Sequence, residues 1–322
     1  MIIVRAPFRI PIAGGGTDLD FYYKKRGGDL ISATIDQYIY ILISIRPLDK
    51  KILIQNTKTQ FANNIKYVKN KLIKEILINC GFKEGIQVAN ISTLPTQTGL
   101  GSSSTLTVGL IKGLLKIKIK NIGKNNLAKF AYKIERKKLK FDGGWQDQII
   151  ASYGGIQRIK IDKKGKFKCN SIKIKKGNLL KLEKHLFLIY SEETRNSEKI
   201  INAQRKNIEK IIQTYDKIKL KVKIIEKYLI QGNVAKIGNI FHDHWIEKKK
   251  LTNNISNSRL DRMYNHMMLS KLFYGGKIIG AGGGGFFLMV LKNENKTIEF
   301  LNRNKFRFTR IKFDHLGTKI IS

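Results

Sequence analysis

The sequence predicts an α+β fold, and three observations lead to this prediction. Predicted strands and helices are mixed along the 322 residues without the regular strand–helix–strand alternation of a doubly wound sheet. Apolar residues make up 42% of the chain, which suffices for a sizeable core in one or two domains. Glycine-rich loops follow apolar, strand-like runs at three places, residues 14–16, 99–101 and 282–285.

The first half of the chain mixes predicted sheet and helix. Runs rich in Ile, Tyr and other residues common in strands predict β-strands at 1–9, 29–36, 38–46, 52–55, 85–91, 156–161 and 167–174. A glycine-rich loop is expected at 10–18, directly after the first strand. Apolar residues at helical spacing predict helices at 19–25, 68–79, 106–116, 125–138 and 147–152.

The second half begins with a short apolar run, 186–190, which predicts a buried strand and a domain boundary. We therefore expect two domains, residues 1–185 and 186–322. Helices are predicted over 198–231, as two helices, and at 234–250, 257–274 and 297–302. Strands are predicted at 277–279, 286–291 and 306–313.

The formal net charge of +38 raises the question of nucleic-acid binding. The lysines are spread over the whole chain between Ile and Asn residues, and the sequence contains no Arg-rich tail or zinc finger. Because Lys, Ile and Asn share A/T-rich codons, a biased genome accounts for this composition. We expect no specific nucleic-acid partner, although the charge should attract small anionic ligands.

The sequence indicates a cytoplasmic protein with no membrane partner. Residues 1–5 lack the order of a signal peptide, and no apolar run approaches the roughly 18 residues of a membrane-spanning helix. Cys80 and Cys169 fit no metal spacing and are expected to be reduced and structural. The sequence leaves the oligomeric state open, with a homodimer as one arrangement.

The most informative segment is LPTQTGLGSSST, residues 94–105, between a predicted strand and a predicted helix. Gly99 and Gly101 let the backbone bend sharply and approach a ligand closely. Three hydroxyls then open the helix, whose N-terminal N–H groups and dipole suit a phosphate, and hydroxyls there can also reach a metal on that phosphate. The alternative is a Gly/Ser turn with a good helix cap. No Walker motif occurs.

Two acids could complete such a site. Glu135 lies on a predicted helix, and Asp147 follows twelve residues later, past Gly143 and Gly144. A magnesium nucleotide needs an oxygen ligand on the metal, and an acceptor hydroxyl needs a group that takes its proton. The alternative is that Glu135 pairs with Arg136 or a neighbouring lysine on a solvated helix face.

With these segments the chain resembles the GHMP kinases, a family that includes galactokinase, homoserine kinase and mevalonate kinase. Three segments match in order and spacing: residues 6–18 (APFRIPIAGGGTD), 95–104 (PTQTGLGSSS) and 280–285 (GAGGGG). The first resembles more narrowly the branch that phosphorylates D-glycero-D-manno-heptose 7-phosphate. Residues 143–148 (GGWQDQ) resemble both that branch and the L-fucokinases, so the sugar stays open.

The resemblance implies an N-terminal domain of the ribosomal-protein-S5 type, a C-terminal ferredoxin-like domain, and ATP and Mg²⁺ as cofactors. Asp147 matches the carboxylate that orients or deprotonates the acceptor hydroxyl, and Arg9 matches the cation beside it. Ser103 and Glu135 match the magnesium ligands. The nucleotide is expected at Pro95, Gly99, Leu100, Gly101, Ser102, Ser103 and Ser104. The sugar is expected at Gly14, Gly15, Gly16, Thr17 and Asp18.

The resemblance thus implies an ATP-dependent sugar kinase that phosphorylates an anomeric hydroxyl, with D-glycero-D-manno-heptose 7-phosphate as the favoured substrate. L-Fucokinase or another free-sugar kinase is the alternative enzyme. Arg195 is expected to bind the phosphate of the acceptor, because a guanidinium matches phosphate oxygens, and Lys277 is a further candidate for anion contact. The alternative of another class is a basic RNA-binding protein of the S5 type, which has no need for Ser103, Glu135 and Asp147 together.

Overall fold

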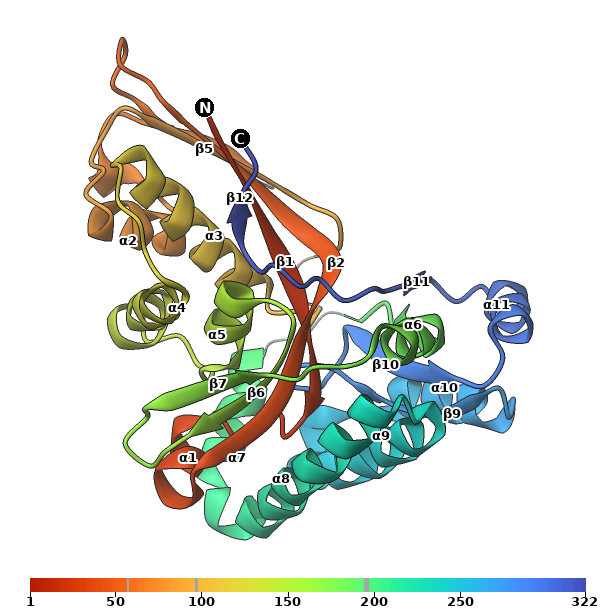
Figure 1. The fold of residues 1–322 in the computed structure, drawn as a ribbon. Helices are drawn as coiled ribbons and strands as arrows, with labels where there is room; N and C mark the ends of the chain where they lie inside the picture. Colours follow the sequence, from red (N-terminus) through yellow and green to blue (C-terminus); the bar gives the residue numbers. More distant parts are fainter. Residues whose placement is uncertain (57, 96–97, 194–196) are drawn as a thin grey trace.

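The computed structural model describes residues 1–56, 58–95, 98–193 and 197–322. Within these residues, the strands form one sheet of eight strands and one of four, and helices pack on both (Figure 1). Strands and helices do not alternate regularly, so the fold is α+β, as predicted. No helix of these residues is both long and apolar enough to cross a bilayer.

The eight-stranded sheet has the order β12-β1-β2-β5-β3-β4, with β6 paired to β2 and β7 to β6. Its pairs are antiparallel except for the parallel pair of β3 and β5. The long strand β2 pairs with β5 at one end and with β6 at the other, so the sheet forks along it. The strands are β1 (Ile2–Ala13), β2 (Gly28–Ile45), β3 (Ile52–Gln55), β4 (Thr59–Ala62), β5 (Ile86–Ser92), β6 (Ile156–Ile161), β7 (Phe167–Ser171) and β12 (Lys319–Ile320).

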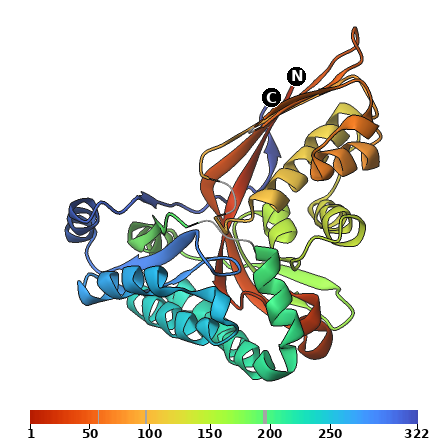
Figure 2. The same cartoon turned by 180° about the vertical axis from the view of Figure 1, so that it is seen from behind.

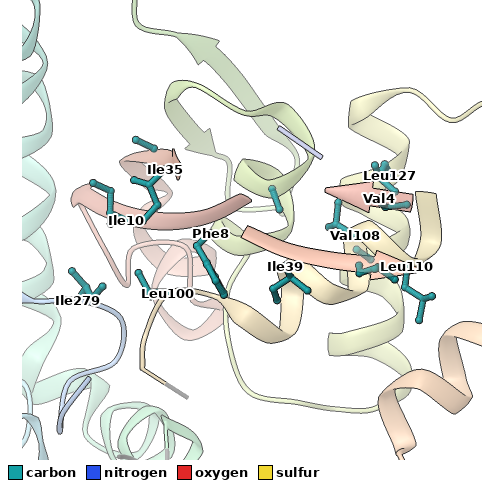
Figure 3. Close-up of a cluster of buried hydrophobic side chains, with 14 of the residues drawn as sticks. Val4, Phe8, Ile10, Ile35, Ile39, Leu100, Val108, Leu110, Leu127 and Ile279 are labelled. Carbon is teal, nitrogen blue, oxygen red and sulfur yellow. The ribbon is translucent and has the colours of Figure 1, made fainter. Parts of the chain in front are cut away.

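Helices cover one face of this sheet (Figure 1): α2 (Lys71–Asn79), α3 (Ser102–Ile117), α4 (Lys124–Tyr132) and α5 (Gln146–Tyr153). Helix α3 lies directly on the strands, because a Cβ atom at its Gly109 would be 2.4 Å from Ile41 and one at Gly113 would be 2.5 Å from Ile43. Figure 3 shows Val108 and Leu110 of this helix in the same buried cluster as β1 residues. This packing fixes where the N-terminus of α3 points.

The second sheet has the order β11-β8-β10-β9 and belongs to the second half of the chain. Its strands are β8 (Leu186–Tyr190), β9 (Phe273–Ile278), β10 (Phe286–Leu291) and β11 (Phe308–Arg310). Helix α9 packs on β9 and β10, while α8 contacts both α9 and the strands β1 and β2 of the first sheet (Figures 1 and 2). The other α-helices are α1 (Asp20–Arg26), α6 (Lys176–His185), α7 (Ser197–Lys206), α8 (Ile208–Gln231), α9 (Val234–Lys249), α10 (Ser258–Leu269) and α11 (Glu294–Arg303).

The chain leaves the first sheet after β7 and enters the second at β8. The predicted boundary between residues 185 and 186 falls at this change of sheet, and we keep it as a proposal. The last strand, β12, returns to pair with β1, so the two termini lie side by side (Figures 1 and 2). The C-terminal residues therefore add to the first sheet.

Several predicted elements differ from the structure. The strands predicted at 29–36 and 38–46 form the single strand β2, and β1 continues to Ala13 through residues predicted as loop, because Ile10 and Ile12 are buried in the core. The helix predicted to reach residue 274 ends at Leu269, and Phe273 starts β9. Sequence reasoning missed α6, whose ten residues bury only Leu182.

Candidate active site

One cavity of about 710 Å³ lies where the two halves of the chain meet. Residues from all three segments that resemble the GHMP kinases line it: Gly15 and Gly16 of 6–18, Gly99 and Gly101 of 95–104, and Gly280 of 280–285. The acids and the arginine singled out in the sequence, Asp18, Glu135, Asp147 and Arg9, line the same cavity. The structure therefore brings together segments that lie up to about 270 residues apart in sequence.

The phosphate-loop candidate forms one wall of this cavity. Ser102, Ser103 and Ser104 form the first turn of α3 and line the cavity, and no described side chain caps the helix. Such an end presents unpaired N–H groups and a positive dipole to an anion. Gly101 precedes the helix at φ +77°, and a Cβ atom there would lie 3.3 Å from the side chains of Arg9 and Asp147. Glycine at this position thus lets the phosphate loop, Arg9 and Asp147 lie close together.

Two predicted members of this loop do not line the cavity. Leu100 is buried in the core beside Phe8 (Figure 3), and its carbonyl accepts a hydrogen bond from the N–H of Arg9 at 3.2 Å. Pro95 is not among the residues that line the cavity, and its carbonyl accepts a hydrogen bond from the Thr98 hydroxyl at 2.8 Å. Both residues shape the loop, while Thr96 and Gln97 lie outside the described residues.

Arg9 and Asp147 form a bidentate ion pair. Nε of Arg9 lies 2.6 Å from Oδ1 of Asp147, and its second nitrogen, Nη2, lies 3.0 Å from Oδ2. The third nitrogen donates to the carbonyl of Gly99, so the same guanidinium also holds the phosphate loop. The Arg9 side chain is 6% exposed and the Asp147 side chain 22%, so the carboxylate keeps a face toward the cavity. This geometry fixes Asp147 without removing it from a ligand's reach.

Glu135 lies in a π-helical segment, Lys133–Lys138, that continues α4. Such segments often occur at functional sites. Its Oε2 accepts hydrogen bonds of 2.8 Å from the hydroxyl of Ser104 and from Nε2 of Gln148 and lies 3.3 Å from Arg136. Its Oε1 is buried without a hydrogen-bond partner among the described residues. The expected pairing with Arg136 is present, but Glu135 is 1% exposed and does not lie on a solvated face.

The first glycine loop presents Asp18 to the cavity. Its Oδ2 accepts from the N–H of Gln146 at 3.0 Å, and burial, with the nearby charge of Asp147, raises the pKa of Asp18. The close approach requires a glycine at 144, because a Cβ atom there would lie 1.9 Å from Oδ2. Gly15, Gly16 and Asp18 line the cavity.

Thr17 and Gly14 have a structural part in this loop. The buried Thr17 hydroxyl donates to the carbonyls of Gly14 at 2.7 Å and Asp29 at 2.9 Å, and neither Thr17 nor Gly14 lines the cavity. A Cβ atom at Gly14, whose φ is +68°, would lie 2.1 Å from the carbonyl oxygen of Asp29. The two residues therefore fix the loop against β2.

Sequence reasoning missed part of the cavity wall. Tyr215 donates to Oε1 of Gln204 at 2.8 Å, and both side chains line the cavity from α8 and α7. Tyr215 lies close enough to Gly16 that a Cβ atom at that glycine would be 2.6 Å from its ring. In the sequence, Tyr215 belongs to a stripe of apolar residues at helical spacing. A tyrosine in a buried stripe needs a hydrogen-bond partner for its hydroxyl, and this need is the signal that could have marked it as a cavity residue.

The two predicted anion contacts of the second half differ in outcome. Lys277 lines the cavity and donates to the carbonyl of Ile12 at 2.6 Å. Arg195 lies outside the described residues. The third glycine loop packs on the phosphate loop, because a Cβ atom at Gly285 would lie 2.1 Å from the carbonyl oxygen of Thr98.

Comparison with known proteins agrees with this architecture. The profile of the GHMP kinases N terminal domain matches residues 63–155. The chain is 29% identical over 312 residues to D-glycero-alpha-D-manno-heptose 7-phosphate kinase of Campylobacter jejuni, covering 92% of this chain and 91% of the relative. The chain is a relative of the GHMP kinases. With their N-terminal domain and their fold, it is an enzyme, a phosphotransferase.

Two further proteins are similar to this chain over most of its length. A solved structure of a D-glycero-D-manno-heptose 1-phosphate kinase from Bacteroides thetaiotaomicron superposes with a TM-score of 0.83 at 23% identity, covering 100% of this chain and 99% of that one. The bifunctional fucokinase/GDP-fucose pyrophosphorylase of Arabidopsis thaliana is 25% identical over 329 residues, 93% of this chain but 31% of that protein. This chain thus spans about a third of the length of the plant protein.

Proposed function

We propose that the protein is an ATP- and Mg²⁺-dependent sugar kinase. The observation that carries this proposal is the bidentate pair of Arg9 and Asp147 beside the uncapped N-terminus of α3. The N–H groups of the loop around Gly99 to Ser104 bind the nucleotide phosphates. Asp147 orients the acceptor hydroxyl and takes its proton, and Arg9 stabilises the charge on the transferred group. Because phosphoryl transfer depends mainly on positioning and electrostatics, these few groups suffice.

The donor set fits a magnesium ion. The buried Oε1 of Glu135 has no partner among the described residues and is a hard oxygen ligand of the kind that Mg²⁺ prefers. The hydroxyl of Ser104 is already bonded to Glu135 and Gln148, so Ser103, which lines the cavity, is the hydroxyl that we propose for the metal. When bound, the ion would neutralise charge on the nucleotide phosphates.

We propose D-glycero-D-manno-heptose 7-phosphate as the acceptor, phosphorylated at its anomeric hydroxyl. The Campylobacter relative, which this chain covers almost completely, supports this choice. Asp18, with Gly15 and Gly16, lies at the cavity wall where it can accept hydrogen bonds from sugar hydroxyls. The fucokinase relatives keep L-fucose as a second candidate. We also propose a cytoplasmic location and a small-molecule substrate without a specific nucleic-acid partner.

The test is ADP release from ATP across a panel of acceptors: the heptose 7-phosphate, the free heptose, L-fucose, galactose and mevalonate. We expect the heptose 7-phosphate to be used with the highest kcat/KM. Preference for L-fucose would favour the second candidate. A flat, background response to every acceptor would remove the sugar-kinase proposal.

Gly144→Ala should raise the KM for the acceptor at least about tenfold and leave the KM for ATP nearly unchanged. The added Cβ atom would lie 1.9 Å from Oδ2 of Asp18 and must push that carboxylate away from the N–H of Gln146. Overpacking of this kind also costs about 1–3 kcal/mol of stability. Steady-state kinetics and thermal unfolding check both effects.

Gly123→Ala is the matched control, because no atom lies within 4 Å of a Cβ built there and its φ is −71°. If Gly144→Ala and Gly123→Ala have the same acceptor KM, Asp18 has no part in acceptor binding.

A further inference from the structure

Helices α7 and α8 give the cavity a polar wall. Gln204 on α7 and Tyr215 on α8 both line the cavity, although they are only 3% and 1% exposed. On α7, Ser197, Ile201 and Gln204 recur at helical spacing and all line the cavity, so one face of this helix borders it. A buried polar side chain in such a wall needs hydrogen-bond partners, either from the protein or from a ligand.

Tyr215 fixes how the amide of Gln204 is turned. Burial, together with the charge of Asp18, raises the pKa of Tyr215, so its hydroxyl keeps its proton and donates to Oε1 of Gln204 at 2.8 Å. This is the one side-chain hydrogen bond of Gln204 among the residues that the structure describes. Because Oε1 is held by Tyr215, Nε2 of Gln204 keeps two N–H groups that can donate to a ligand.

Gln204 and Tyr215 lie beside the loop proposed for the acceptor. A Cβ atom at Gly16 of this loop would be 2.6 Å from the Tyr215 ring and 3.3 Å from its hydroxyl oxygen. Arg205, the next residue on α7, donates to the carboxylate of Asp20, just after the loop, at 2.7 Å. Helix α7 is thus fixed against the acceptor loop, whereas the nucleotide phosphates have their proposed site at the N-terminus of α3.

The polar groups around Asp18 are unevenly matched, because donors are in excess. Nε2 of Gln146, a residue that also lines the cavity and is 6% exposed, is buried without a partner in the described part of the chain. Gln204 adds a second amide with unused N–H groups, whereas the carboxylate of Asp18 accepts hydrogen bonds. A sugar hydroxyl both donates and accepts, so one hydroxyl can donate to Asp18 and accept from an amide.

We infer that Gln204, oriented by Tyr215, donates a hydrogen bond from Nε2 to a hydroxyl oxygen of the acceptor sugar and thereby helps to select it. The inference rests on the proposed sugar-kinase function and adds to it a contact from the second half of the chain. A site built to bind a substrate hydroxyl rejects an analogue that lacks it, because the buried amide is then left without a partner. Gln204 therefore favours acceptors that carry a hydroxyl at this position.

The first test is Gln204→Met, which keeps the length of the side chain and removes its amide. We expect the KM for the heptose 7-phosphate to rise about tenfold, the scale of one neutral hydrogen bond, and the KM for ATP to stay nearly unchanged. Gln213→Met is the matched control, because Gln213 is an exposed glutamine on α8 that does not line the cavity. An unchanged acceptor KM in Gln204→Met, or the same rise in both variants, would overturn the inference.

Acceptors that lack one hydroxyl separate a direct contact from a structural role. Monodeoxy derivatives of the heptose 7-phosphate are compared with the parent sugar in the unaltered protein and in Gln204→Met. We expect the unaltered protein to use one derivative at least about tenfold less well than the parent, and the variant to use that derivative about as well as the parent. If every derivative loses the same factor in both proteins, Gln204 makes no direct contact and the inference fails.

Gln204→Glu keeps the test decisive if Gln204→Met does not fold. The ionised glutamate has the shape of glutamine and can still accept from Tyr215, but it has no N–H group to donate, so the same derivative should lose its disadvantage.

If no acceptor leads to ADP release, the kinase proposal fails and binding decides the inference. Without ATP, the heptose 7-phosphate should then raise the melting temperature of Gln213→Met more than that of Gln204→Glu. Equal shifts in the two variants, or none, would overturn the inference.

Discussion

Asp147→Asn should lower turnover by about 10²–10⁴-fold and leave nucleotide binding intact. The amide cannot take a proton from the acceptor hydroxyl, and loss of a positioned acid–base group typically costs this much. Asparagine has nearly the same shape and can still accept one hydrogen bond from Arg9, which now contacts both carboxylate oxygens. Steady-state kinetics, with nucleotide affinity measured separately, separates the chemical step from binding.

Asp142→Asn provides the control. Asp142 lines the same cavity, but its carboxylate pairs with Arg205 on α7 at 3.2 Å and is not bonded to Arg9. We expect only a small change in kcat there. Turnover like that of the unaltered protein in Asp147→Asn would exclude Asp147 from the chemical step and leave its bond to Arg9 as a structural contact.

The sequence predicted best the features that depend on local backbone geometry. Gly99, Gly101 and the three following serines were placed as a loop entering a helix from their order alone, and the structure has α3 starting at Ser102. The α+β class was also predicted correctly, because it follows from the order of apolar patterns. Such features need no knowledge of partners far away in the chain.

The sequence could not predict features set by distant contacts. The continuity of β2 depends on pairing with β1, β5 and β6 at once, and no local pattern shows this. Likewise, the sequence predicted Thr17 as a sugar contact, but its hydroxyl donates a hydrogen bond to the carbonyl of Asp29, twelve residues away. His244 and Lys248 look like surface residues of a basic helix, and only the packing of α9 on β9 buries them.

Glu135→Gln should weaken metal binding at least about tenfold, since even outer partners of metal ligands are worth about 10- to 100-fold in affinity. The substitution removes the charge and replaces one oxygen by an amide group. The new amide group also lies beside two hydrogen-bond donors, because Ser104 and Gln148 each donate to Oε2 of Glu135 at 2.8 Å. Binding of Mn²⁺ in the presence of ATP, followed by electron paramagnetic resonance, measures the loss without relying on turnover. We expect the affinity for metal-free ATP to change much less.

Glu198→Gln is the matched control, because Glu198 lines the same cavity from α7 but is exposed. Its removal should leave Mn²⁺ binding near the level of the unaltered protein, which excludes a general effect of one lost negative charge. The result also decides between the two interpretations of Glu135. If Glu135→Gln binds Mn²⁺ as tightly as the unaltered protein, the buried carboxylate serves only its contacts with Arg136, Ser104 and Gln148, and the metal must be held by other groups.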